Sequence, residues 1–134
     1  QPGTQLLENH IHDIPLNAGR AESNGMFLDE GTTELVIEGN LIYDTVRSPF
    51  RFHKARENVV RKNVVTLREG VPIVRYNATD EKFITLEGNT VIPHEKRGEV
   101  FQKALERGLE AAVLDSASYR RYAEEREREA QAAA

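Results

Sequence analysis

An apolar segment with an asparagine set into it recurs through the first two thirds of the chain. The asparagines are Asn9, Asn40, Asn63 and Asn89, and the steps between them are 31, 23 and 26 residues. Each lies among leucine, isoleucine or valine residues that show no helical spacing. A repeat in the twenties with β-branched segments is typical of a solenoid, in which each repeat forms one coil. The sequence therefore predicts an all-β fold of about four coils.

Alternation around each asparagine separates the inside of a coil from its outside. The positions three and five before the asparagine and two after it are expected to point inward. These positions hold Leu6, Ile37, Val60, Leu86, Leu35, Asn58, Ile84, Ile11, Ile42, Val65 and Val91. They are almost wholly apolar, and we predict that they form the core.

The asparagines themselves are expected at a corner of the coil. A short amide tolerates left-handed backbone and can hydrogen-bond to its equivalent about 4.8 Å away in the next coil. The four residues should therefore form a ladder along the stack. The alternative is an antiparallel meander with four unrelated asparagine turns.

Three segments carry a resemblance to a known family. They are residues 25–31 (GMFLDEG), the Gly-Asn-Leu-Ile-Tyr-Asp coil at 39–44, and Phe50-Arg51-Phe52-His53 with Arg56-Glu57-Asn58-Val59-Val60. Together they resemble bacterial right-handed parallel β-helix repeat proteins, over Thr4 to about Pro93. That resemblance implies a right-handed parallel β-helix with a C-terminal α-helical tail. The family often has His-x-His where this chain has Arg51-Phe52-His53, and its members carry further coils on the N-terminal side.

Many members of this family are exported polysaccharide lyases and glycoside hydrolases. The resemblance therefore implies that this chain is the C-terminal part of a carbohydrate-active protein that is secreted or periplasmic. Its implied partner is a polysaccharide or an oligosaccharide. A non-catalytic β-helix module, serving as a scaffold, a sugar-binding surface or an oligomerisation unit, is the competing interpretation. Fold alone does not decide between them.

From His94 onward the pattern changes to helical spacing. An amphipathic stripe comprises Val100, Phe101, Ala104, Leu105, Leu109, Ala112 and Val113. We therefore expect coils over residues 1–93 and a helical tail over residues 94–134. The tail should cover four apolar residues that point out of the coils, or else cap the last coil. Those four residues are Leu41, Tyr43, Val64 and Ile92.

Chemically competent side chains recur in the third strand of each coil. Aligning the coils at Gly25, Pro49 and Pro72 places Met26, Phe50 and Ile73 inward, and Phe27, Arg51 and Val74 outward. Two residues later, the outward column reads Asp29, His53 and Tyr76, with Glu30, Lys54 and Asn77 at the adjoining corner. Parallel β-helix enzymes carry their sites on such an outer strand face.

The candidate catalytic residues are Asp29, Glu30 and His53, and the candidate substrate-binding residues are Arg51, Lys54, Arg75 and Tyr76. A carboxyl group could act as acid or base with the imidazole as its partner. The two arginines could neutralise the carboxylate of a uronate sugar. The alternative is structural: a surface ion pair between Asp29 and His53, and a corner salt bridge between Glu30 and Lys54.

His10 and His12 point to the same side of one strand and would make half of a metal site, in the run His10-Ile11-His12-Asp13. The sequence identifies no third ligand, so no metal and no cofactor is predicted. A net charge of −4 argues against nucleic acid. No apolar segment approaches the length of a membrane span, so no membrane partner is predicted. An open first coil, with Leu6 and Ile11 at its edge, predicts a homo-oligomer.

Overall fold

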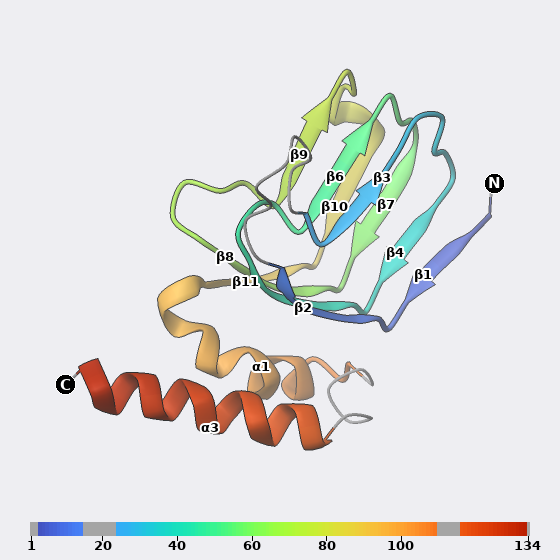
Figure 1. The fold of residues 1–134 in the computed structure, drawn as a ribbon. Helices are drawn as coiled ribbons and strands as arrows, with labels where there is room; N and C mark the ends of the chain where they lie inside the picture. Colours follow the sequence, from blue (N-terminus) through green and yellow to red (C-terminus); the bar gives the residue numbers. More distant parts are fainter. Residues whose placement is uncertain (1–2, 15–23, 110–115, 134) are drawn as a thin grey trace.

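The structure is a computed structural model that describes residues 3–14, 24–109 and 116–133. In those ranges the strands form three parallel sheets that stack in a solenoid-like arrangement, with the helices along one side (Figure 1). Every pairing between described strands is parallel, so the antiparallel meander is wrong. The longest step between asparagines, 31 residues, predicts an excursion of the chain from Pro15 to Gly25, and most of that segment lies outside the described residues.

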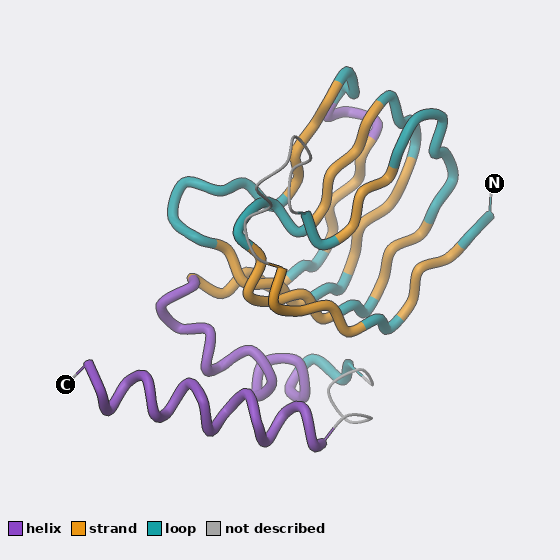
Figure 2. The backbone as a smooth tube through the Cα atoms, viewed as in Figure 1, coloured by secondary structure: helices purple, strands orange, loops and turns teal. Residues whose placement is uncertain are grey.

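Each of the first three coils contributes one strand to each of the three sheets, and the last coil contributes one strand to the first two sheets (Figure 2). The first sheet contains β1 (Gln5–Leu7), β4 (Val36–Glu38), β7 (Asn58–Arg61) and β10 (Ile84–Glu87). The second contains β2 (His10–Ile14), β5 (Leu41–Thr45), β8 (Val64–Leu67) and β11 (Thr90–Pro93). The third contains β3 (Met26–Leu28), β6 (Phe50–His53) and β9 (Val74–Asn77).

One short helical segment lies between the strands of the last two coils, and the other described helical segments follow the last strand. A short 3₁₀ turn, η1 (Glu81–Phe83), precedes β10, and a second 3₁₀ segment, η2 (His94–Glu99), follows β11. The chain then forms α1 (Val100–Glu106) and α3 (Ser116–Ala133). Among the described residues, no helix combines the length and the apolar character that crossing a membrane requires.

The interior of the coils is apolar, as alternation predicted. In the two middle coils Ile37, Ile42, Val60 and Val65 are fully buried and in register with one another. Phe50 and Phe52 of the third sheet complete the same cluster. Aligned side chains in successive coils thus stack on one another and exclude water from the centre of the solenoid.

Two residues expected in the core are exposed. Leu86 pairs with Val60 and Val91 pairs with Val65, so their register is as predicted, yet they are 42% and 47% exposed. The reason is their position in the last coil. Strands β10 and β11 are edge strands, and no described strand follows them to cover their open side.

The asparagine ladder is confirmed. The side-chain oxygen of Asn40 accepts from the backbone N–H and the amide of Asn9, at 2.8 and 2.9 Å. Asn63 accepts from Asn40 in the same way, at 2.8 and 2.9 Å, and Asn89 from Asn63, at 3.1 and 2.9 Å. The side-chain amides of Asn40, Asn63 and Asn89 also donate to the strand carbonyls of Leu6, Ile37 and Val60, respectively. Buried amides are thereby paired, and adjacent coils are fixed in register.

A further asparagine has a related role that the sequence did not reveal. Asn58 was placed in the inward set, and it is buried. Its side-chain oxygen accepts from the N–H of Leu35 at 2.9 Å, and its amide donates to the carbonyls of Thr32 and Arg56. Asn58 is therefore a corner asparagine that links two coils.

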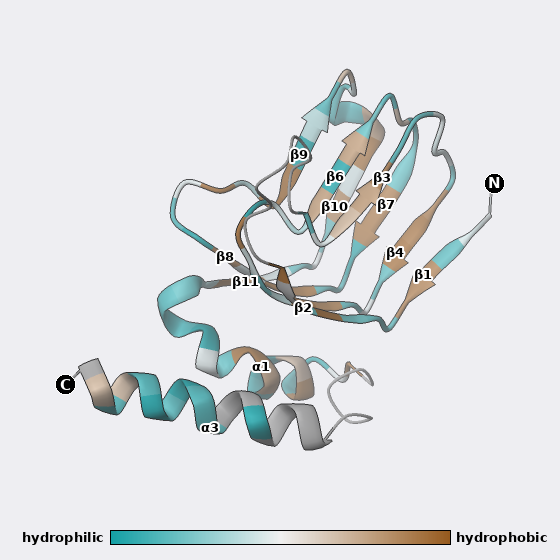
Figure 3. Cartoon of the chain, viewed as in Figure 1, coloured by the Kyte–Doolittle hydropathy of each residue, from teal (hydrophilic) through white to brown (hydrophobic). Residues whose placement is uncertain are grey.

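Helix α1 lies on the outer side of the second sheet. The outward residues Leu41, Tyr43, Val64 and Ile92 form one buried cluster with Val100, Phe101, Ala104 and Leu109. Leu105, also expected in this contact, is exposed instead. Apolar colouring follows the coil strands and the buried face of α1, whereas α3 is largely hydrophilic where it is coloured (Figure 3). Ala112 and Val113 lie outside the described residues.

Replacing Asn63 by alanine tests the ladder. The change leaves the buried N–H of Asn40 without its acceptor, so we expect the free energy of unfolding to fall by about 3 kcal/mol. Asn9 stands at the end of the ladder and is exposed. Asn9→Ala leaves Asn40 its other bonds and should cost less than about 1 kcal/mol. Urea denaturation measures the free energy of unfolding of both variants. Equal losses would contradict the view that the buried asparagines contribute more to stability than the exposed one.

A second pair of variants tests the packing of α1 on the second sheet. Phe101 is fully buried between α1 and the strands, so Phe101→Ala should lower the free energy of unfolding by about 3–5 kcal/mol. Leu105→Ala, on the exposed side of the same helix, should change it by less than about 1 kcal/mol. Thermal unfolding followed by circular dichroism compares them. Similar midpoints for the two variants would mean that α1 is not packed as described.

Candidate functional site

The third sheet turns one face to the interior and the other to solvent. Met26 aligns with Phe50, and Gly25 precedes this pair at a close approach, where a Cβ would lie 2.8 Å from the carbonyl oxygen of Pro49. Only glycine fits there, so β3 can pair with β6 directly. The predicted alignment of the first two strands is thereby confirmed.

The third strand is shifted by one residue from its predicted alignment. Phe50 pairs with Val74, not Ile73, and Phe52 pairs with Tyr76. Val74, expected outside, is therefore buried inside the coil, and Ile73 is only partly buried. The cause is the preceding turn, which is one residue longer between β8 and β9 than between β5 and β6. Because side chains alternate, a shift of one residue exchanges the two faces.

Tyr76 consequently does not belong to the outward column. It lies on the inward side, half-buried against the core. Burial raises the pKa of its phenol, and the carboxylate of Glu81 adds to the effect. Its place beside His53 is taken by Asn77, which was expected at the corner. The outward column is Asp29, His53 and Asn77.

Asp29 and His53 are joined as expected. The Nδ1 of His53 lies 3.0 Å from a carboxylate oxygen of Asp29, and both side chains face solvent. Asp29 also accepts from the backbone N–H of Glu30 at 2.7 Å. The hydrogen bond from His53 is the main cause, and that from the Glu30 backbone the next, of a lowered pKa at Asp29. Asp29 is thus ionised at neutral pH and orients the imidazole.

The adjoining corner carries a second pair. The ammonium of Lys54 lies 3.0 Å from a carboxylate oxygen of Glu30, with both side chains largely exposed. Lys54 has a left-handed backbone (φ 50°), and its N–H donates to the carbonyl of Asn77. An exposed pair of this kind contributes little to stability. Both pairs required by the structural alternative are therefore present.

A row of larger side chains lies beside this column. Phe27, Arg51 and Arg75 occupy equivalent positions on β3, β6 and β9. The guanidinium carbon of Arg51 lies 4.5 Å from the centroid of the Phe27 ring, within the range of a cation–π contact. The Nε of Arg51 also donates to the side-chain oxygen of Asn77 at 2.7 Å. Phe27 remains 45% exposed.

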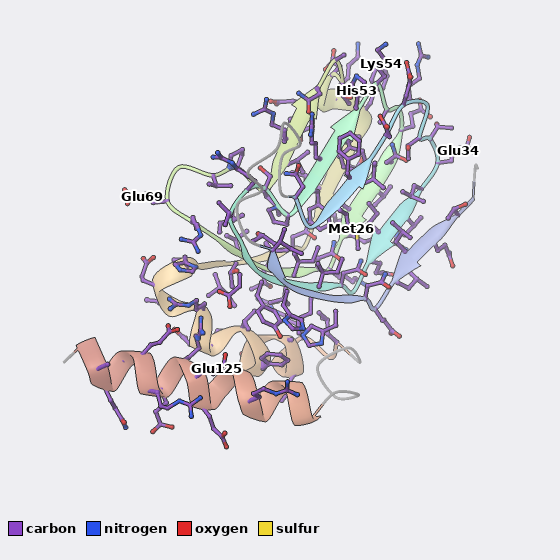
Figure 4. The ribbon with its side chains drawn as sticks, viewed as in Figure 1. Met26, Glu34, His53, Lys54, Glu69 and Glu125 are labelled. Atoms are coloured by element: carbon purple, nitrogen blue, oxygen red, sulfur yellow. The ribbon has the colours of Figure 1, made fainter. Side chains whose placement is uncertain are left out.

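These six residues form one solvent-facing surface, called here the outer face of the third sheet: Phe27, Asp29, Arg51, His53, Arg75 and Asn77. His53 and Lys54 lie at the end of the coils that is far from α3 and its labelled residue Glu125 (Figure 4). The helices pack on the second sheet instead. The outer face is therefore not covered by the described part of the helical tail.

The two histidines near the start of the chain belong to an aromatic cluster. The Nε2 of His10 lies 2.7 Å from the hydroxyl of Tyr43, and the ring of His12 stacks on Tyr43 with centroids 5.0 Å apart. Phe101 of α1 contacts His10 edge-on. Nowhere in residues 3–14, 24–109 and 116–133 do three or more side chains of the metal-binding types come together. The side chain of Asp13 lies outside the described residues.

Two members of the outer face were absent from the candidates chosen from sequence. Phe27 was placed outward but given no role, although an exposed aromatic between polar neighbours was the available signal. Asn77 was assigned to the corner because the longer turn was not recognised. Comparisons with models of protein families, with curated proteins and with solved structures found no match for this chain.

The hydrogen bond between His53 and Asp29 can be tested by titration. His53→Ala removes the donor that contributes most to the lowered pKa of Asp29, so that pKa should rise towards its ordinary value of 3.8. Lys54→Ala, one residue away and paired with Glu30, should leave it unchanged. Carboxyl carbon shifts in NMR measured against pH report this value. An unchanged pKa in the His53 variant would show that the bond does not form in solution.

Proposed function

We propose that the outer face of the third sheet binds a saccharide chain, and that the coils are a segment of a right-handed parallel β-helix of the carbohydrate-active kind. The observation that carries the proposal is the exposed ring of Phe27 with the guanidinium of Arg51 beside it. An aromatic face and a fixed cation on a flat, uncovered sheet suit a ligand with both apolar and polar surfaces.

Sugars match the rest of this surface. The C–H face of a sugar ring can lie on an aromatic ring, while hydroxyl groups need nearby donors and acceptors. Asp29 supplies acceptors, and His53 and Asn77 offer ring and amide groups along the same column. Parallel strands place equivalent residues about 4.8 Å apart, so one sugar unit can contact two coils.

The charges favour an acidic saccharide. Arg51 and Arg75 are opposite one another on neighbouring strands. The two guanidinium groups place positive charge at one point of the surface, beside the carboxylate of Asp29. A guanidinium binds a carboxylate through two parallel hydrogen bonds, so a uronate would match this pair. Lys54, at the corner, would extend the cationic path along the chain.

Binding is better supported than hydrolysis. Hydrolysis by two carboxyl groups requires one that is protonated at working pH. The lowered pKa of Asp29 disfavours that role, and Glu30 is engaged by Lys54. We therefore assign Asp29 the role of orienting His53, and Glu30 that of pairing with Lys54 at the corner of the coil.

A lyase reaction is the second candidate, and the pair of Asp29 and His53 favours it. A carboxylate that holds Nδ1 of a histidine leaves Nε2 directed outward, as a general base requires. In such a reaction His53 would remove the proton next to the uronate carboxylate, and Arg51 or Arg75 would stabilise the negative charge that develops. The electron pair would then expel the glycosidic oxygen and leave a double bond in the product.

Titration calorimetry with polygalacturonate and alginate, and with a neutral glucan as comparison, tests the proposal. Binding of an acidic chain is expected, and Arg51→Ala should weaken it tenfold or more, about 1.4 kcal/mol. Phe27→Ala should weaken it to a similar degree. His53→Ala should leave the fold intact because the side chain points out of the core. Arg128→Ala on the far side of α3 is the matched control and should bind normally.

Ultraviolet absorbance of an unsaturated product, measured in the same mixtures, separates the two candidates. Absorbance that appears with the native chain and disappears in the His53 variant would establish the lyase reaction. Binding without product would leave a saccharide-binding module. If neither the acidic nor the neutral polymers bind, the outer face is a structural surface and the scaffold interpretation replaces this proposal.

A further inference from the structure

Among the described side chains of helix α3, those that contact the rest of the molecule through ion pairs are Arg126 and Glu129. Arg126 is well covered and contacts Asp44 of β5, and Glu129 contacts Arg97 of η2. The described apolar residues of this helix, Ala130 and Ala132, are exposed. The contrast with α1 is clear, because α1 buries Val100, Phe101 and Ala104.

The attachment is centred on Asp44, at the end of the second sheet. Asp44 has a left-handed backbone (φ 54°), and its N–H donates to the hydroxyl of Thr66. Its carboxylate is only 9% exposed. Arg126 of α3 lies 3.4 Å from one carboxylate oxygen, and Arg97 of η2 lies 3.6 Å from the other. One carboxylate on the coils thus faces a cation from each of two other elements.

A second carboxylate closes the arrangement. Glu129 of α3 contacts Arg97, and it lies 2.9 Å from Arg126. Glu125 adds a longer contact of 3.7 Å to Arg126. We call Asp44, His94, Arg97, Arg126 and Glu129 the Asp44 cluster. It joins β5, η2 and α3, and its ionised pairs are balanced while the histidine is neutral.

We propose that α3 is an electrostatic latch, docked on the coils by the Asp44 cluster and released by high salt or by acid. Salt acts on the pairs of Glu129 with Arg97 and Arg126, because the Glu129 side chain is 51% exposed and exposed ion pairs are screened when the Debye length falls to about 3 Å near 1 M. The apolar contact of α1 does not weaken in this way. Salt should therefore separate the two helices, leaving α1 in place while α3 moves away.

Acid acts through His94. Its Nδ1 lies 4.0 Å from Asp44, and the charged groups around it are Arg68 after β8, Glu95 and Arg97 on η2, and Arg126 on α3. Glu129 on α3 faces the same arginines. Protonation of His94 adds a positive charge to a site that already holds three guanidinium groups. A charged imidazole there is partly desolvated and is repelled by the three arginines, and both effects disfavour the docked state.

The direction of the response follows from the pKa of His94. Burial lowers this pKa from its ordinary value of 6.5, and the three arginines lower it further. Release of α3 would expose the imidazole and remove Arg126, so the released state binds more protons than the docked one. Docking of α3 is therefore strongest above pH 6.5, and it weakens as the pH falls from there through the lowered pKa of His94. The same linkage makes acid favour release.

The absence of cysteine in the chain makes a labelling experiment direct. Spin labels on Glu69→Cys, in the turn after β8, and on Gln131→Cys, on α3, report the distance between coils and latch by pulsed electron resonance. Both positions are exposed and outside the Asp44 cluster. In the full chain at pH 7.5 and low salt, one narrow distance distribution is expected. At 1 M NaCl, or at pH 5, it should broaden.

Three variants of the doubly labelled chain decide the mechanism. His94→Gln should lose the response to acid and keep the response to salt. Arg126→Met should show the broad distribution under all conditions. Asp44→Asn, which suits the left-handed backbone, should do the same, and it replaces the methionine variant if that variant folds poorly. Arg128→Met, on an exposed position of α3, is the matched control and should behave as the parent.

Circular dichroism in each condition shows whether the coils stay folded. A distribution that stays narrow in salt, in acid and in both cluster variants would overturn the proposal, because α3 would then be held by other contacts. An acid response that persists in His94→Gln would overturn the assignment to His94. Loss of the coil signal together with the distance change would also overturn it, since the event would be unfolding of the whole chain.

Discussion

The structure depends on the bond between Asn40 and Asn63, because it fixes the register of the two coils that form the centre of the stack. Both side chains are fully buried, and each amide must be paired within the protein. The ladder satisfies them only when equivalent asparagines lie directly above one another. That register then stacks Ile37 on Val60 and Ile42 on Val65. Burial supplies the driving force, and the ladder selects one alignment among several that would bury similar area.

The ladder and the inward residues could be predicted because both are local. Their spacing from each asparagine is constant along the first two sheets, so the pattern around Asn63 repeats the pattern around Asn40. The third sheet lies beyond a turn of variable length, and there the sequence-based alignment was wrong by one residue. Residues before Val74 give no local sign of which one starts the strand. Pairing with Phe50 decides it, since a shifted strand would bury Arg75.

The same alternation gives the outward faces of the second and third sheets opposite chemistry. On the second sheet the outward residues include Leu41 and Val64, and α1 covers them. On the third sheet the outward residues are charged or amide-bearing apart from Phe27, and the described helices leave them open. An apolar outer face is stable only when something packs on it, whereas a polar one can face water. The location of this solvent-facing surface could therefore be predicted from the third strands, although the residues that belong to it could be named only once the register was known.

The two helices of the tail are held by interactions that respond differently to the solvent. Burial of Val100 and Phe101 strengthens slightly or stays constant as salt is added, because it involves no charge. The pairs of the exposed Glu129 with Arg97 and Arg126 are screened by the same salt. Asp44 is also held away from water, so removing either arginine would leave a poorly solvated charge. The coils and α1 thus share one apolar contact, and the described ion pairs of α3 join it to Asp44 of β5 and to Arg97 of η2.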